Sequence, residues 1–157
     1  MKRFVDTNIF IYSVTNHPQF GETARQILMR IEQGETTVTS TLVLCEIAWM
    51  LEAMGKQSDI KPTLEKILSY KNLEILGFDQ DDILLGANNM RLYGVDFNDG
   101  INIAIMTGIG TYETYSNDHK HRAREMQHVR TVEAARYLQH GRNPHQKNKS
   151  LGHRSTA

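Results

Sequence analysis

The stretch that decides the fold is residues 3–12, which read Arg3-Phe4-Val5-Asp6-Thr7-Asn8-Ile9-Phe10-Ile11-Tyr12. Its first residues predict a short strand that ends at Asp6. The polar pair Thr7-Asn8 supplies residue types that commonly cap helices, so the apolar residues 9–12 predict a short helix. A strand followed directly by a helix is the first unit of an alternating α/β pattern.

The sequence continues to alternate between helical and strand patterns. Apolar residues at helical spacing, with glycine or polar stops, predict helices from about Glu22 to Gly34, Leu42–Leu51, Asp59–Tyr70, Asp79–Tyr93, and from Asn98 towards Gly108. Short β-branched or alternating runs predict strands at Thr36–Thr39, Leu73–Leu76, Thr111–Tyr115 and Val129–Val132, and a last short helix is expected at Ala134–His140. This alternation predicts an α/β fold in which helices cover both faces of a parallel sheet.

Length and composition point to one soluble domain. The 157 residues can bury a hydrophobic core of their own. No apolar run approaches the ~18 residues of a membrane span, and the N-terminus lacks a signal-peptide core, so we expect no membrane association. The single cysteine, Cys45, cannot form an internal disulfide, which favours a reducing, cytoplasmic location.

Charge is distributed unevenly along the chain. Residues 1–118 hold 9 Lys/Arg against 16 Asp/Glu, whereas residues 119–157 hold 9 Lys/Arg against 2 Asp/Glu. The basic end is consistent with a polyanionic partner, or equally with a solvated tail. From Arg142 onward Leu151 is the only large apolar residue, so we expect a domain at 1–133 and, at 134–157, a short helix with a disordered basic tail.

Four acids fall near the carboxyl ends of predicted strands, where parallel α/β sheets bind ligands. Asp6 ends the first strand, and Glu46 lies in the helix after the second. Asp99 lies in the first turn of its helix, and Asp118 follows the strand at 111–115. Although distant in sequence, the four are expected to meet at one edge of the sheet.

Glu46 is the most informative acid because it shares a helical stripe with Leu42, Trp49 and Ala53. A carboxylate on an apolar face needs a compensating cation. No Lys or Arg occurs between residues 31 and 55, which leaves a metal ion or a distant basic side chain. The alternative is a partly exposed glutamate at the edge of the helix.

Each of the other acids also has an ordinary structural explanation. Asp6 could cap the next helix, although Thr7 and Asn8 are available for that role. Asp99 could interact only with the helix dipole, with Asp96 as a loop or cap residue, and Asp118 could be a turn residue. The joint placement of the acids favours a site. A cluster of carboxylates needs cations, and all-oxygen ligands favour Mg²⁺ or Mn²⁺, which can activate a water against a phosphodiester.

Four segments in order resemble the PIN-domain ribonucleases, and among them the VapC-type toxins of toxin–antitoxin pairs. They are Phe4–Tyr12, Thr39-Ser40 through Glu46-Ile47, Asp96–Asp99 with Ile103-Ala104, and Ser116-Asn117-Asp118. The resemblance covers Met1 to about Val132. It implies a three-layer PIN-like fold with a parallel five-stranded sheet, and cleavage of structured RNA by metal-activated water.

The resemblance also implies roles for particular residues. Asp6, Glu46, Asp99 and Asp118 would bind Mg²⁺ or Mn²⁺, and Ser116 would orient Asp6 or a metal-bound water. Asn8 would support them as an amide. A toxin of this family is further expected to form a homodimer and to bind a cognate antitoxin protein, in addition to RNA.

The sequence departs from the family pattern at two places. Gly100 replaces the usual alanine, which is expected to loosen the start of the helix that carries Asp99. His119-Lys120-His121 follows Asp118 where the family often has an aromatic residue, and we interpret these histidines as loop residues rather than zinc ligands. Cys45 is interpreted as an inert core thiol.

The apolar residues Trp49, Met50 and Met54 are expected in the core or at a dimer contact. Two other functions remain open from sequence alone. One is an RNA-processing PIN nuclease outside toxin–antitoxin systems, and the other is a non-catalytic PIN-like scaffold that binds RNA or protein.

The charge asymmetry generates a first prediction. Deletion of residues 142–157 should weaken RNA affinity and flatten its dependence on salt, because fewer phosphates would be neutralised. Filter binding or fluorescence anisotropy at several salt concentrations measures both quantities. Unchanged affinity would show that the basic end does not contribute to RNA binding.

Overall fold

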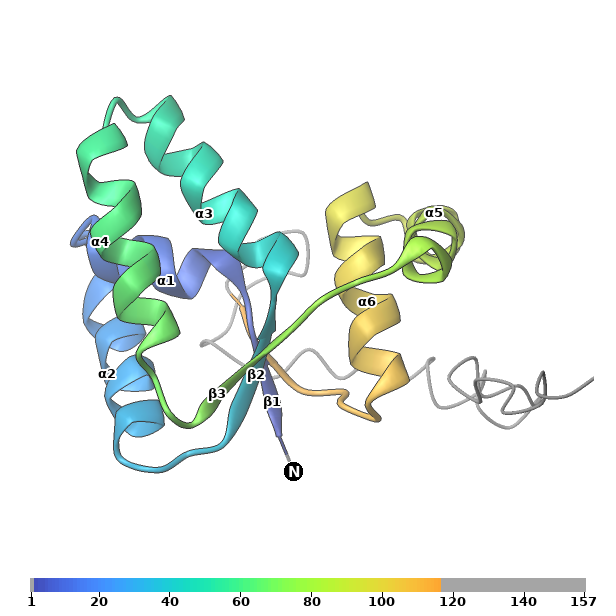
Figure 1. Cartoon of the computed structure of the whole chain (residues 1–157), viewed down its shortest axis with the longest axis horizontal. Helices are drawn as coiled ribbons and strands as arrows, with labels where there is room; N and C mark the ends of the chain where they lie inside the picture. Colours follow the sequence, from blue (N-terminus) through green and yellow to red (C-terminus); the bar gives the residue numbers. More distant parts are fainter. Residues whose placement is uncertain (1, 117–157) are drawn as a thin grey trace, which may run out of the picture.

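The computed structural model describes residues 2–116, which form a parallel sheet between two groups of helices (Figure 1). In chain order the elements are β1 (Arg3–Val5), α1 (Thr7–Val14), α2 (Gly21–Glu32), β2 (Thr37–Ser40), α3 (Thr41–Ala53), α4 (Gln57–Leu68), β3 (Leu73–Leu76), α5 (Gln80–Tyr93), α6 (Phe97–Gly108) and β4 (Thr114–Tyr115). The predicted alternation of strands and helices is therefore confirmed. No helix among these is long and apolar enough to cross a membrane.

The four strands of the described residues lie in the order β3-β2-β1-β4, and every pairing is parallel. The expected fifth strand at Val129–Val132 lies outside the described residues, as do the helix at Ala134–His140 and the basic tail. β4 is shorter than the predicted strand at 111–115. Only its two residues pair with β1, through Phe4↔Thr114 and Val5↔Tyr115, and β1 is itself only 3 residues long.

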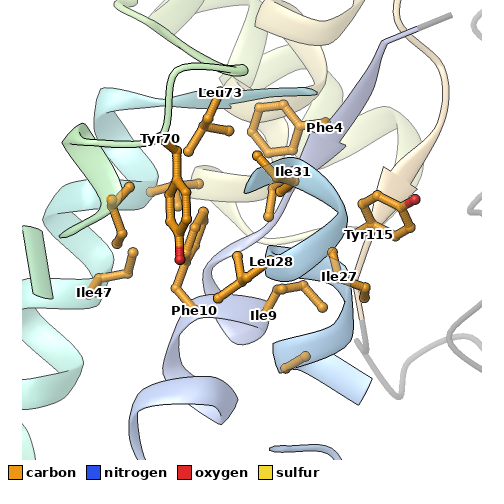
Figure 2. Close-up of a cluster of buried hydrophobic side chains, with 14 of the residues drawn as sticks. Phe4, Ile9, Phe10, Ile27, Leu28, Ile31, Ile47, Tyr70, Leu73 and Tyr115 are labelled. Atoms are coloured by element: carbon orange, nitrogen blue, oxygen red, sulfur yellow. The ribbon is translucent and has the colours of Figure 1, made fainter. Parts of the chain in front are cut away.

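The main core lies between the sheet and helices α1 to α4, which cover one of its faces (Figures 1 and 2). Phe4 and Val5 of the central strand are both buried, as expected for a strand enclosed on both faces. Figure 2 shows Phe10 of α1, Leu28 of α2 and Tyr70, which follows α4, close together in this core. α5 and α6 lie on the other face (Figure 1).

The α5–α6 pair depends on two glycines that let the helix backbones approach each other. A Cβ atom built on Gly100 would lie 2.3 Å from the carbonyl oxygen of Gly86, and one built on Gly86 would lie 2.6 Å from Ile101 Cγ1. The sequence predicted that Gly100 loosens the start of its helix. The structure assigns it the opposite role, because only glycine leaves room for this contact.

Substitution of Gly100 by alanine should therefore destabilise the fold. Helix propensity alone favours alanine by about 1 kcal/mol. The alanine Cβ would, however, clash with the backbone of Gly86, so we expect a net loss of about 1–3 kcal/mol in the free energy of unfolding. Denaturant unfolding measures the difference. Gly77→Ala is the matched control, since a Cβ there meets nothing within 4 Å. A stabilised Gly100→Ala protein would contradict the close approach.

A polar network joins the amino ends of three strands. Arg3 in β1 donates hydrogen bonds to Glu35 (2.8 Å), Glu113 (2.9 Å) and the Tyr115 hydroxyl (3.0 Å). The Tyr115 hydroxyl in turn donates to Glu35 at 2.6 Å. Burial of Glu35 opposes its ionisation, but the hydrogen bonds from Tyr115 and Arg3 outweigh this effect and lower its pKa. The network therefore favours a charged Glu35.

The lowered pKa predicts a pH-dependent contribution to stability. Because the folded pKa of Glu35 lies below the ordinary value of 4.5, its contribution is present above pH 4.5 and is lost as the pH falls through the folded pKa. Glu35→Gln should lower the free energy of unfolding at pH 7, and its difference from the wild type should shrink below pH 4.5. Exposed Glu52→Gln is the control. A pH-independent difference would contradict the charged network.

Candidate active site

The carboxyl ends of β1 and β4 bring Asp6 and Ser116 together, because the two strands are parallel neighbours. The Ser116 hydroxyl donates to Asp6 Oδ2 at 2.6 Å. The Asn8 amide donates to the same oxygen at 3.0 Å and to the Ser116 hydroxyl at 3.2 Å. These side chains are partly buried, so the sheet edge holds a fixed carboxylate rather than a solvated one.

Asp6 is also the N-cap residue of α1. Its backbone is extended (φ −83°, ψ 159°), and its Oδ1 accepts the Thr7 backbone N–H at 2.7 Å. The sequence left open whether Asp6 or the pair Thr7-Asn8 caps this helix, and the structure shows that Asp6 does. Thr7 is the first residue of the helix and is buried, so its hydroxyl is directed to another partner.

That partner is Glu46, whose carboxylate is half-buried and bound from two sides. The Thr7 hydroxyl donates to Glu46 Oε2, and the Asn98 amide donates to Oε1 at 2.8 Å. Among residues 2–116, no lysine or arginine forms an ion pair with Glu46. The described residues thus supply neutral donors, and they do not supply the distant basic side chain that was one of the cations expected from the sequence.

Asp99 lies in the first turn of α6, half-buried. Asp96 is the N-cap residue of this helix, and its carboxylate accepts the Asp99 backbone N–H at 2.9 Å. The interpretation of Asp96 as a cap residue is therefore confirmed, and Asp99 follows it at the same end of the helix. Asp118, together with His119 and His121, lies outside the described residues.

The donor chemistry of this region fits a hard divalent cation, because the candidate ligands are carboxylate oxygens supported by hydroxyl and amide groups. Within residues 2–116, however, no three His, Cys, Asp or Glu side chains lie close enough together to enclose an ion. Magnesium commonly uses only one or two protein carboxylates and keeps several waters, so such an arrangement is compatible with it.

A buried polar pair next to the site was not singled out from the sequence. The Ser40 hydroxyl donates to Asn102 Oδ1 at 2.7 Å and also accepts the Val43 backbone N–H at 3.1 Å, which caps α3. Both side chains are buried. Asn102 interrupts the apolar run Ile101–Met106, and a lone amide in such a run was the available signal.

The outer surface of α3 corrects one further expectation and removes one of the two alternatives for another. Cys45 is exposed, so it is not a core thiol. Trp49, Met50 and Met54 are 54%, 38% and 48% exposed, which excludes them from the core of this chain. α3 therefore presents apolar side chains to solvent beside the half-buried Glu46.

A sequence model of the PIN domain matches residues 3–124 of this chain. The chain belongs to the PIN domain family. The resemblance that the four motifs carried is thus confirmed, and the described sheet and helices are the PIN-like arrangement that it implied. A search among curated proteins gave no match.

Solved structures of other proteins share the fold. VapC20 of Mycobacterium tuberculosis, described as a toxin that cleaves the Sarcin-Ricin loop, has a TM-score of 0.61 and 18% identity over 74% of this chain and 90% of its own. VapBC2 from Rickettsia felis, bound to a DNA fragment from its promoter, has a TM-score of 0.58 and 21% identity, covering 76% and 90%. A toxin–antitoxin complex from Klebsiella pneumoniae has a TM-score of 0.55 and 17% identity, covering 76% and 88%.

Proposed function

We propose that this PIN domain is a metal-dependent endoribonuclease that cleaves structured RNA and acts as the toxin of a toxin–antitoxin pair. Membership of the PIN family supports the nuclease activity. The similar fold of VapC20, described as a toxin that cleaves the Sarcin-Ricin loop, supports RNA as the substrate. The remaining support comes from the chemistry of the sheet edge.

The observation that carries the proposal is the linkage of three acid-bearing elements through Glu46. Its carboxylate is bound by Thr7, which directly follows Asp6, and by Asn98, which directly precedes Asp99. The segments that carry Asp6, Glu46 and Asp99 are thereby joined, although these acids lie up to 93 positions apart in the sequence. Acids that serve only as caps or surface charges do not require such linkage.

In this proposal Asp6, Glu46, Asp99 and Asp118 hold Mg²⁺ or Mn²⁺. When bound, the ion would supply an activated water and would stabilise the charge of a phosphodiester during cleavage. Ser116 and Asn8 fix the Asp6 carboxylate by donating hydrogen bonds to its Oδ2. Thr7 and Asn98 do the same for Glu46, so the orientation of both carboxylates is already restricted before an ion binds.

The proposed biology follows the family resemblance. A toxin of this type would be cytoplasmic, would form a homodimer and would be blocked by a cognate antitoxin protein. The toxin–antitoxin complex from Klebsiella pneumoniae shares the fold, which supports an antitoxin partner. The single cysteine is consistent with a reducing compartment.

Cleavage of a labelled structured RNA by purified protein tests the proposed activity. We expect cutting with Mg²⁺ or Mn²⁺ and none with chelator. Asp6→Asn should reduce the rate by more than about 100-fold, since loss of a group that only supports a metal ligand already costs 10–100-fold. Asparagine caps helices as well as aspartate does, so this variant separates charge from capping.

Asp59→Asn, at a half-buried position in the first turn of α4, is the matched control and should cut RNA normally. Growth arrest on overexpression that disappears with Asp6→Asn would support the toxin role over RNA processing. Cutting that persists in chelator would contradict the metal mechanism. Absence of cutting together with absence of metal binding would instead favour a non-catalytic scaffold.

A further inference from the structure

The carboxylate of Glu46 has a different helix attached to each of its oxygens. The Thr7 hydroxyl of α1 donates to Oε2, and the Asn98 amide of α6 donates to Oε1 at 2.8 Å. A glutamate side chain has several rotatable bonds, and an unrestrained one loses considerable entropy when it binds an ion. The two donors have already fixed the orientation of this carboxylate.

Asn98 belongs to a pair of amides on the same face of α6. Asn102 follows it by four positions, which places the two side chains one above the other. Asn102 accepts a hydrogen bond from Ser40, which is the N-cap residue of α3. Asn98 donates a hydrogen bond to Glu46, which lies further along α3. α6 is therefore attached to α3 at two points, one buried and one at the half-buried carboxylate.

We propose that Asn98 is a positioning residue for the metal-binding carboxylate of Glu46, and that Asn102 keeps α3 and α6 in register for this contact. The inference rests on the proposed function. Neither residue would touch the ion. Asn98 would act on metal affinity through Glu46, while Asn102 would act on the stability of the α3–α6 contact.

The neutrality of the donors is what makes this arrangement suitable for a metal site. An ionised carboxylate can accept about four hydrogen bonds or ligand contacts, and Glu46 accepts one at each oxygen. Its negative charge is not compensated by an ion pair with any lysine or arginine of residues 2–116. An amide therefore orients the group without consuming the charge that attracts a cation.

Two measurements on the purified full chain test the inference. Calorimetry in the absence of RNA gives the Kd for Mn²⁺, and thermal unfolding gives the stability of the metal-free protein. Asn98→Ala should raise the Kd for Mn²⁺ by about 10- to 100-fold, as is typical for loss of a group that supports a ligand. The unfolding midpoint of the metal-free protein should stay close to that of the wild type. Asn98→Lys should abolish Mn²⁺ binding, because its ammonium group would neutralise Glu46.

Asn89 provides the matched control, since its amide also donates to α6, but to the Gly100 carbonyl oxygen at 2.9 Å. Asn89→Ala should lower the unfolding midpoint and leave the Kd for Mn²⁺ unchanged. Equal loss of affinity in Asn89→Ala and Asn98→Ala would overturn the positioning role in favour of general destabilisation. Failure of both Asn98 variants to fold would likewise assign Asn98 a purely structural role.

The Thr7 side of the carboxylate offers an isosteric comparison. Thr7→Val removes the hydroxyl and should weaken Mn²⁺ binding, whereas Thr7→Ser retains the donor and should restore it. Glu46→Gln separates the inference from the proposed function. If Glu46→Gln weakens Mn²⁺ binding while Asn98→Ala does not, the proposed metal site is supported and the positioning role of Asn98 is wrong. If Glu46→Gln binds Mn²⁺ as the wild type does, the proposed metal site itself is wrong.

Discussion

The parallel pairing of β1 with both of its neighbours is the constraint from which the rest of the molecule follows. The strand has 3 residues, yet it pairs with β2 on one side and with β4 on the other. Backbone hydrogen bonds from Phe4 to Glu113 (2.8 Å) and from Asp6 to Tyr115 (3.0 Å) fix the register with β4. The described strands all run in the same direction, so their carboxyl ends lie at the same edge of the sheet. Polar residues that follow the strands therefore gather at that edge.

The second level of organisation is the attachment of α6. The helix carries Asp99 and Asn98, but its only extensive helical neighbour among the described elements is α5. The glycines at positions 86 and 100 allow the two backbones to approach closely, and Ser40 and Asn102 join α6 to the start of α3. A small second cluster of Leu42, Ile101 and Ile105 fills the space between them. The position of one acid at the sheet edge thus depends on packing far from the main core.

Most of the fold could be predicted because it rests on local patterns. The helical stripe of Ala24, Ile27 and Ile31, the acidic first turn of α5 and the stop at Gly94 all appeared where the sequence indicated. Element ends were less certain. The strand predicted from 111 pairs with β1 only at Thr114 and Tyr115, because pairing depends on the register with a strand that is distant in the chain.

The same contrast holds for the candidate site. The sequence identified Asp6, Glu46, Asp99 and Ser116, and the structure brings Ser116 onto Asp6 as the resemblance implied. It did not identify Asn98 or Thr7 as partners of Glu46, because an amide or hydroxyl beside an acid in the chain looks like an ordinary cap or turn residue. Their roles appear only when α1, α3 and α6 are side by side.

By itself, then, the sequence determined the order and type of the elements and the parallel sheet, and it singled out the candidate acids. These follow from periodicity, capping chemistry and composition, which act over a few residues. Tertiary structure alone decided that Asp6 caps its helix, that Cys45 and Trp49 face solvent, and that Gly100 is needed for close packing. It also decided that neutral donors hold Glu46. The physical reason is that burial and hydrogen-bond partners are set by segments distant in the chain, whose approach no local pattern encodes.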